Sequence, residues 1–156
     1  MPMLEAAVLL EERSAAALLA QALAPISLML GIVPLRTSVA RHLGAAAALL
    51  GQPDKARAYY QQALEVCAKV RFRPEIALTH LQLAELLLEQ AETPSPQSSP
   101  KGRGRSPSPP GRGQGEGEAL RKEALEHLDF AIAEFQEMKM QTYLERALRH
   151  KGLLKA

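Results

Sequence analysis

The sequence predicts an all-α protein built from stacked antiparallel helix pairs, and three observations carry this prediction. Ala and Leu dominate a composition without Trp or Asn, which suits helices, and runs of β-branched residues are nearly absent. Residues 38–74 contain two helical patterns separated by Gly51 and Pro53, a helix stop followed by a helix start. The apolar spacing of this stretch then recurs farther along the chain, as it does in repeat architectures.

The recurrence has two registers that agree with each other. The first-helix positions that return after forty residues are Leu43, Gly44 and Ala47, repeated as Leu83, Ala84 and Leu87. The second-helix positions that return after sixty-eight residues are Ala56, Tyr60, Ala63, Leu64, Cys67, Val70 and Phe72, repeated as Ala124, Leu128, Ala131, Ile132, Phe135, Met138 and Met140. The difference between the two offsets predicts an insertion between the helices of the later pair.

Small side chains at Gly44, Ala56 and Ala63 allow the two helices of residues 38–74 to approach closely, while Leu43 and Tyr60 fill the space between them. A Leu at position 44 should therefore overpack the contact. An Ala there should be neutral or mildly stabilising, because Gly inside a helix costs roughly 0.5–1 kcal/mol relative to Ala.

This pattern resembles the tetratricopeptide repeat, whose signature reads L-G-x6-G-x4-A-x3-[FY]-x2-A. The match departs from the family only at Ala47, where a larger residue is usual. The resemblance implies a helical array of about two and a half repeats that binds other proteins. The residues that carry the signature are Leu43, Gly44, Gly51, Ala56, Tyr60, Ala63, Leu83, Ala84, Ala124, Leu128 and Ala131.

Helix start and stop signals place the remaining elements. Residues 3–23 are helical in pattern, with a break at residues 11–14 and Ser14 as the expected N-cap of the second piece. Residues 25–36 are apolar with two Pro, which favours an irregular or extended connection, a short buried helix being the alternative. Further helices are expected from Thr37 or Ser38 to about 50, and then over residues 54–70, 74–92, 118–138 and 141–154.

Residues 93–117 differ in composition from the rest of the chain. They contain six Pro, six Gly and five Ser, with no aliphatic or aromatic residue, so they cannot bury enough apolar surface to offset the entropy of ordering. We therefore expect a disordered insert within the second repeat. Residues 1–92 and 118–156 should form one helical domain around it.

The charge of the chain gives little support to a nucleic-acid partner. The net charge is +2, but four basic and two acidic residues lie in residues 93–118, and the rest of the chain carries fifteen of each sign. The alternative to a protein-binding role is a nucleic-acid-associated protein acting through the Arg, Gly, Ser and Pro of the insert. Four cations without an aromatic residue would bind nucleic acid weakly, so a flexible linker is the favoured interpretation.

The candidate chemical groups do not assemble into a catalytic, cofactor or metal site. His42, His80, His127 and His150 have no metal-ligand spacing, and Cys67 lies on an inward-facing stripe without a partner base. We therefore expect a protein that is not an enzyme. The single Cys, the lack of a basic N-terminal leader pattern and the lack of a long apolar run predict a cytoplasmic location.

The resemblance also implies a binding surface, since the first helices of tetratricopeptide repeats line a concave face. The positions that correspond to it are Arg41, Ala45, Ala48, Thr79, Gln82 and Glu85. In addition, the forty-residue period resembles the C-terminal MalT-like and LuxR-type repeats of large bacterial signalling ATPases and adenylate-cyclase-linked regulators. That likeness implies a scaffold arm whose partner is a protein or the upstream domain of a parent protein.

The N-terminal residues predict a further contact. Residues 3–23 are apolar on more than one face, and a preceding helix to cover them is missing from the pattern. We therefore expect self-association or docking through this stretch, and Glu at Leu9 and Leu19 should abolish it.

Overall fold

The computed structural model describes residues 2–27, 37–92 and 112–155, and within these ranges it contains helices and no β-strand. The α-helices in chain order are α1 (Pro2–Leu9), α2 (Arg13–Leu23), α3 (Val39–Leu49), α4 (Pro53–Lys69), α5 (Arg73–Glu92), α6 (Arg112–Glu137) and α7 (Gln141–Lys155). One turn of 3-10 helix, η1 (Ala24–Ile26), follows α2. None of the described helices is long and apolar enough to cross a membrane.

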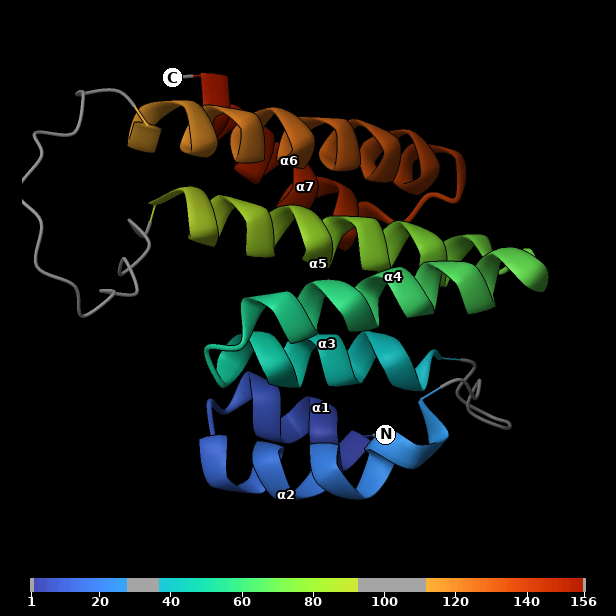
Figure 1. The fold of residues 1–156 in the computed structure, drawn as a ribbon. Coiled ribbons are helices and arrows are strands. Elements are labelled where there is room, and N and C mark those ends of the chain that lie inside the picture. Colours follow the sequence, from blue (N-terminus) through green and yellow to red (C-terminus); the bar gives the residue numbers. More distant parts are fainter. Residues whose placement is uncertain (1, 28–36, 93–111, 156) are drawn as a thin grey trace, which may run out of the picture.

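The helices stack as successive antiparallel pairs (Figure 1). α1 packs against α2, α3 against α4 and α5 against α6, and α7 then lies along α6. Consecutive pairs are joined by α2 packing on α3 and α4 packing on α5. The prediction of an all-α, tetratricopeptide-like array is confirmed, but the described helices form three pairs and α7, more than the two and a half repeats expected from the sequence.

The turns that end four of the helices share one backbone geometry. Glu11, Gly51, Arg71 and Lys139 each adopt a left-handed conformation, with φ between 52° and 71°. After each of them the next N–H reaches five residues back, as in the 2.9 Å bond from the Gln52 N–H to the Ala47 carbonyl oxygen. Because the turn at Glu11 lies forty residues before the turn at Gly51, α1 and α2 form a complete repeat in the same register as α3 and α4.

One residue pair sets the spacing of the two helices within each repeat. A Cβ added to Gly44 would lie 2.6 Å from two carbons of the buried Tyr60 ring, so this contact requires Gly. At the equivalent positions of the other repeats, one residue of the pair is again small and the other large. The large residue lies on the first helix in the first repeat and on the second helix in the other two. The three pairs are Leu4 with Ala20, Gly44 with Tyr60, and Ala84 with Leu128.

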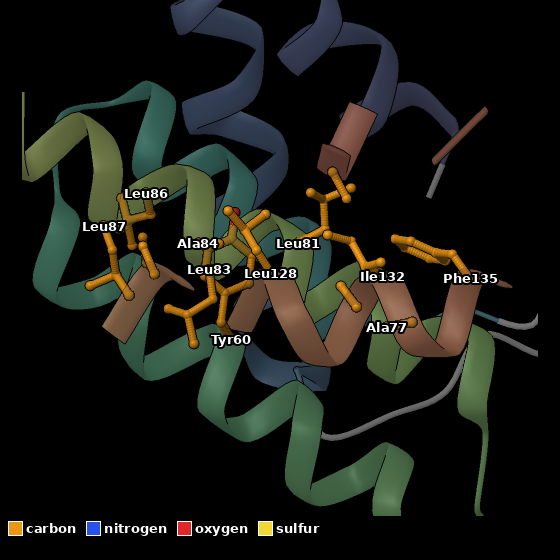
Figure 2. Packing of buried hydrophobic residues seen from close by; sticks show 14 of the residues in the cluster. Tyr60, Ala77, Leu81, Leu83, Ala84, Leu86, Leu87, Leu128, Ile132 and Phe135 are labelled. Atoms are coloured by element: carbon orange, nitrogen blue, oxygen red, sulfur yellow. The ribbon is translucent and has the colours of Figure 1, made fainter. Parts of the chain in front are cut away.

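Two apolar clusters form the core. The larger one runs from α3 to α7, and Figure 2 shows its centre, where Tyr60, Ala84 and Leu128 converge. The smaller one joins α1, α2 and α3. Tyr59 of α4 packs against both clusters and so connects the first repeat to the rest of the array.

Several boundaries differ from the sequence-based expectation. α6 begins at Arg112, so residues 112–117 are helical although they were assigned to the insert. α6 approaches α5 at Gly117, where an added Cβ would lie 3.6 Å from the Ala91 carbonyl oxygen, whereas residues 115 and 116 are exposed. α2 starts at Arg13 with Glu12 as its N-cap residue, in place of Ser14. Of the expected irregular segment, residues 25–27 continue into the 3-10 turn, whereas residues 28–36 lie outside the described ranges.

Candidate protein-binding groove

A groove with a volume of about 190 Å³ lies where α1, α3, α5 and α7 meet. These four helices are the first helix of each successive pair, so the groove runs across the array rather than within one repeat. Its walls combine apolar and polar side chains. They are Glu5, Val8 and Leu9 from α1, Arg41, His42 and Ala45 from α3, Leu78, Leu81 and Gln82 from α5, and Tyr143 and Arg146 from α7.

The structure brings three of the six residues expected on the concave face into this groove, namely Arg41, Ala45 and Gln82. Ala48 lies farther along α3, half-buried against the larger apolar cluster. Thr79 is fully buried, and its hydroxyl donates a 2.7 Å hydrogen bond to the Glu75 carbonyl within α5. Glu85 sits beside the groove, where it binds the groove residue Arg146.

The floor of the groove rests on a buried carboxylate. Glu75 is 3% exposed, and its Oε1 atom accepts hydrogen bonds from the Thr37 hydroxyl at 2.8 Å, the Ser38 backbone N–H at 2.7 Å and Arg41 Nε at 2.7 Å. This burial is unusual for a carboxylate, because acidic side chains in the first turn of a helix are mostly exposed. A buried carboxylate is stable here because a cation and two further donors compensate its lost hydration.

Glu75 also supplies the cap that the start of α3 requires. The sequence assigned this cap to Thr37 or Ser38, and Ser38 does occupy the N-cap position, but its side chain makes no capping hydrogen bond. The Ser38 hydroxyl is instead buried next to Cys67, and the Glu75 carboxylate accepts the Ser38 N–H. A negative group at a helix N-terminus suits the helix dipole, so one side chain of α5 fixes the position of α3.

Arg41 is held rigidly above Glu75. Its Nη2 donates to Thr37 Oγ1 at 3.1 Å, and its Nη1 donates to Gln82 Oε1 at 3.3 Å. Since a guanidinium can only donate, the oxygen of the Gln82 amide must face Arg41. The two amide N–H groups of Gln82 therefore do not contact Arg41.

His42 completes this cluster as a neutral side chain. Burial first, and then the positive charge of Arg41, lower the pKa of His42 from 6.5 to about 3. Its Nε2 lies 2.8 Å from Thr37 Oγ1. Arg41 Nη2 lies 3.3 Å from the same ring nitrogen, so His42 Nε2 contacts both Thr37 and Arg41.

The rim of the groove is more exposed than its floor. Leu9 is 75% exposed and Tyr143 of α7 is 38% exposed, so two apolar side chains border the opening. Arg146 makes a two-pronged ion pair with Glu85, with distances of 2.6 and 2.7 Å, and His150 Nε2 lies 3.0 Å from the same carboxylate. These contacts attach α7 to α5 and hold Tyr143 at the edge.

A histidine pair between α5 and α6 was not foreseen from the sequence. The Nδ1 atoms of His80 and His127 lie 2.8 Å apart, and the His80 ring packs on Phe130 with a centroid distance of 4.3 Å. Burial, followed by the neighbouring His127, lowers the pKa of His80 to about 4, and burial also lowers the pKa of His127. In the described ranges, neither this pair nor any other group assembles three metal-ligating side chains.

Neither Cys67 nor the hollow on α4 is a better candidate site than the groove. Burial raises the pKa of the Cys67 thiol to about 11, so it is not activated as a nucleophile. A shallow hollow of about 690 Å³ on α4 is wider than the groove, but among the described residues α4 alone lines it. It therefore lacks the opposing walls that enclose a ligand.

Comparison with known proteins supports the architecture. Residues 35–95 match the tetratricopeptide repeat family, and this range spans α3, α4 and α5. Searches of curated proteins and of solved structures found no match. The matched range includes the Gly44–Tyr60 contact and the Glu75 cluster. The chain is thus a tetratricopeptide-like helical array, and its matched repeats are of the type that serves as a protein–protein interaction module.

Proposed function

We propose that this chain is a non-enzymatic interaction module that binds a segment of a partner protein in the groove between α1, α3, α5 and α7. The observation that carries the proposal is the combination of an exposed apolar rim with a rigid polar floor. Leu9 and Tyr143 are accessible before binding, whereas Arg41 is already fixed by Glu75. A surface that is ordered in advance loses little entropy when a partner arrives.

The dimensions and chemistry of the groove suggest what enters it. A volume of about 190 Å³ corresponds to about six water molecules at about 30 Å³ each, which is space for a large apolar side chain. Val8, Leu9 and Leu78 would cover such a side chain, and water leaving these walls would favour binding. The amide N–H groups of Gln82 would receive a backbone carbonyl of the same segment. We infer a partner segment with an apolar anchor residue.

The finer assignments from the sequence stay proposals. These are the descent from a bacterial signalling regulator, the upstream domain of a parent protein as the partner, and the cytoplasmic location. The alternative of a nucleic-acid-associated protein rests on an insert of which residues 93–111 lie outside the described ranges, and no observation favours it. We propose residues 93–111 as the linker between α5 and α6, shortened from residues 93–117 because α6 begins at Arg112.

Peptide selection tests the groove directly. The purified chain would be screened against a phage-displayed library of random short peptides, and an enriched peptide would be synthesised and titrated by fluorescence anisotropy. We expect enriched sequences to share an apolar anchor. Leu9→Glu should weaken binding by at least about tenfold, equivalent to ~1.4 kcal/mol, because it places a charge on the apolar rim.

Leu148→Glu is the matched control. Leu148 is also an exposed leucine on the first helix of a pair, at 46%, but it does not line the groove. This variant should bind the peptide as the unmodified chain does. The proposal is overturned if the library yields no binder, or if Leu9→Glu and Leu148→Glu bind the selected peptide equally well.

A further inference from the structure

The charged side chains of the groove walls differ in whether they already have an ion-pair partner. Arg41 pairs with the buried Glu75, with 2.7 Å between Arg41 Nε and the carboxylate. Arg146 pairs with Glu85 through two hydrogen bonds. Glu5 of α1 is the third charged residue of the walls, and its exposed carboxylate forms no ion pair or hydrogen bond with any residue that the structure describes. The uncompensated charge of the groove is therefore negative.

The two arginines are not free to receive an acidic partner. Arg41 donates from Nε, Nη1 and Nη2 to acceptors within its own cluster. An acidic side chain that entered the groove would have to displace Glu75 or Glu85, and the displaced carboxylate would lose its partner. For Glu75 this loss is costly, because its carboxylate is buried. His42 adds no positive charge to the walls near neutral pH, since burial lowers its pKa to about 3.

Glu5 lies on the same side of α1 as the apolar part of the groove wall. Val8 and Leu9 follow it by three and four residues, and all three line the groove. Side chains at these spacings are neighbours on a helix, with about 5–6 Å between their Cβ atoms. A segment that places an apolar side chain against Val8 and Leu9 therefore brings its adjacent residues within reach of the Glu5 carboxylate.

A basic side chain of the partner suits this combination of groups. Lys and Arg carry their charge at the end of a long apolar stem, so the stem packs along the apolar wall while the charged end reaches Glu5. An acidic side chain at the same place would meet Glu5 as a like charge, which opposes binding. The groove therefore favours one sign of charge in its partner.

We propose that the partner segment bound in the groove carries a Lys or Arg within four residues of its apolar anchor, and that this basic side chain forms an ion pair with Glu5. Four residues are one turn of a helical segment, and two residues of an extended one span a similar distance. The inference rests on the proposed function and adds to it the charge that the partner must have.

A charge exchange between chain and peptide tests this proposal. Peptides enriched from the random library should carry Lys or Arg near the apolar anchor more often than the unselected library does. Changing this residue to Glu in a synthetic peptide should weaken its binding by about three- to tenfold, because an attraction becomes a repulsion. Glu5→Lys should weaken the original peptide to a similar extent, and it should bind the exchanged peptide more tightly than the unmodified chain does. Fluorescence anisotropy measures the four combinations.

Glu65→Lys is the matched control. Glu65 is also an exposed acid on a helix, and its substitution changes the net charge equally, but it lies on α4 and does not line the groove. This variant should bind each peptide as the unmodified chain does. Glu5→Gln is a second variant, which removes the charge without placing a cation in the first turn of α1. It should bind the original peptide and a form with Gln in place of the basic residue almost equally well.

The possible results separate this inference from the proposed function. A selected peptide that is weakened by Leu9→Ala but binds Glu5→Lys and Glu5→Gln as tightly as the unmodified chain would leave groove binding intact and overturn the ion pair. Enrichment of acidic residues near the anchor would overturn it as well, and so would an equal loss with Glu65→Lys and Glu5→Lys. A library that yields no binder would overturn the proposed function, and this inference with it.

Discussion

Gly44 and Tyr60 determine how closely α3 and α4 approach. From the sequence alone, Ala at position 44 is expected to be neutral or mildly stabilising. The structure contradicts this expectation, because the added Cβ would lie 2.6 Å from the Tyr60 ring, which is buried and cannot move aside without disturbing the core. We predict that Gly44→Ala lowers the free energy of unfolding by about 1–3 kcal/mol, as overpacked cores do, and that Gly44→Leu lowers it further. Urea denaturation measures both.

The third repeat suggests a compensating change. Ala84 faces Leu128 there, at the positions that Gly44 and Tyr60 occupy in the second repeat. Gly44→Ala combined with Tyr60→Leu should therefore lose less stability than the sum of the two single variants. A double-mutant cycle in urea gives the coupling energy. Strictly additive losses would mean that these two side chains do not share one contact.

The buried histidines predict a stability that depends on pH. The pKa of His42 is about 3 and that of His80 about 4 in the folded chain, both below the unfolded value of 6.5. As the pH falls below about 6.5 the unfolded chain takes up protons that the folded chain does not, so the free energy of unfolding must decrease. Between about pH 6.5 and its pKa in the folded chain, each histidine lowers the free energy of unfolding by at most about 1.4 kcal/mol per pH unit. Above about pH 6.5 it has no such effect.

Urea unfolding at about pH 7 and about pH 5 measures this loss. His80→Gln should make the loss smaller, because one of the groups that bind protons only in the unfolded chain is removed. An equal loss in the unmodified chain and the variant would show that His80 titrates normally in the folded chain.

At the scale of the elements, three turns between helices hold a non-glycine residue in a strained backbone conformation, which a substitution by Gly would relieve. Glu11, Arg71 and Lys139 adopt positive φ values that cost an L-residue roughly 1–2 kcal/mol, whereas the equivalent Gly51 avoids this cost. Part of the gain from Gly is lost to the greater entropy of its unfolded chain. We predict that Lys139→Gly raises the free energy of unfolding by up to about 1 kcal/mol and that Gly51→Ala lowers it by a similar amount. Thermal unfolding compares them, and a destabilising Lys139→Gly would contradict the prediction.

The helices could be predicted from the sequence because their signals are local. Gly51 and Pro53 mark a stop and a start within four residues, and the first-helix positions Leu43, Gly44 and Ala47 return forty residues later. The start of α6 could not be predicted in this way. Its first residues are rich in Gly and look like a linker in composition, so they carry no local signal for the helix that they form.

The groove floor was beyond the reach of sequence reasoning because its contacts join residues that are far apart in the chain. Glu75 lies in the first turn of α5, and nothing in its own helix marks it as buried. Its partners Thr37, Ser38 and Arg41 lie 34 to 38 residues away, and only the stacking of α3 against α5 brings them together. The spacing of His80 and His127, 47 residues apart, gives no signal either.

At the scale of the whole molecule, the groove is a property of the stack and of no single repeat. It combines an apolar rim from α1 and α7 with polar groups that α3 and α5 hold in place. We therefore expect partner binding to depend on the packing of all four helices.

Chemical-shift mapping tests the central claim, partner binding in the groove, most directly. The isotope-labelled chain would be titrated with the selected peptide, and the shifts of its backbone amides recorded. The account predicts that the largest changes occur at groove residues of four separate helices, including Val8, Ala45, Gln82 and Tyr143. Changes confined to α4, around the shallow hollow at Gln61 and Glu65, would contradict it.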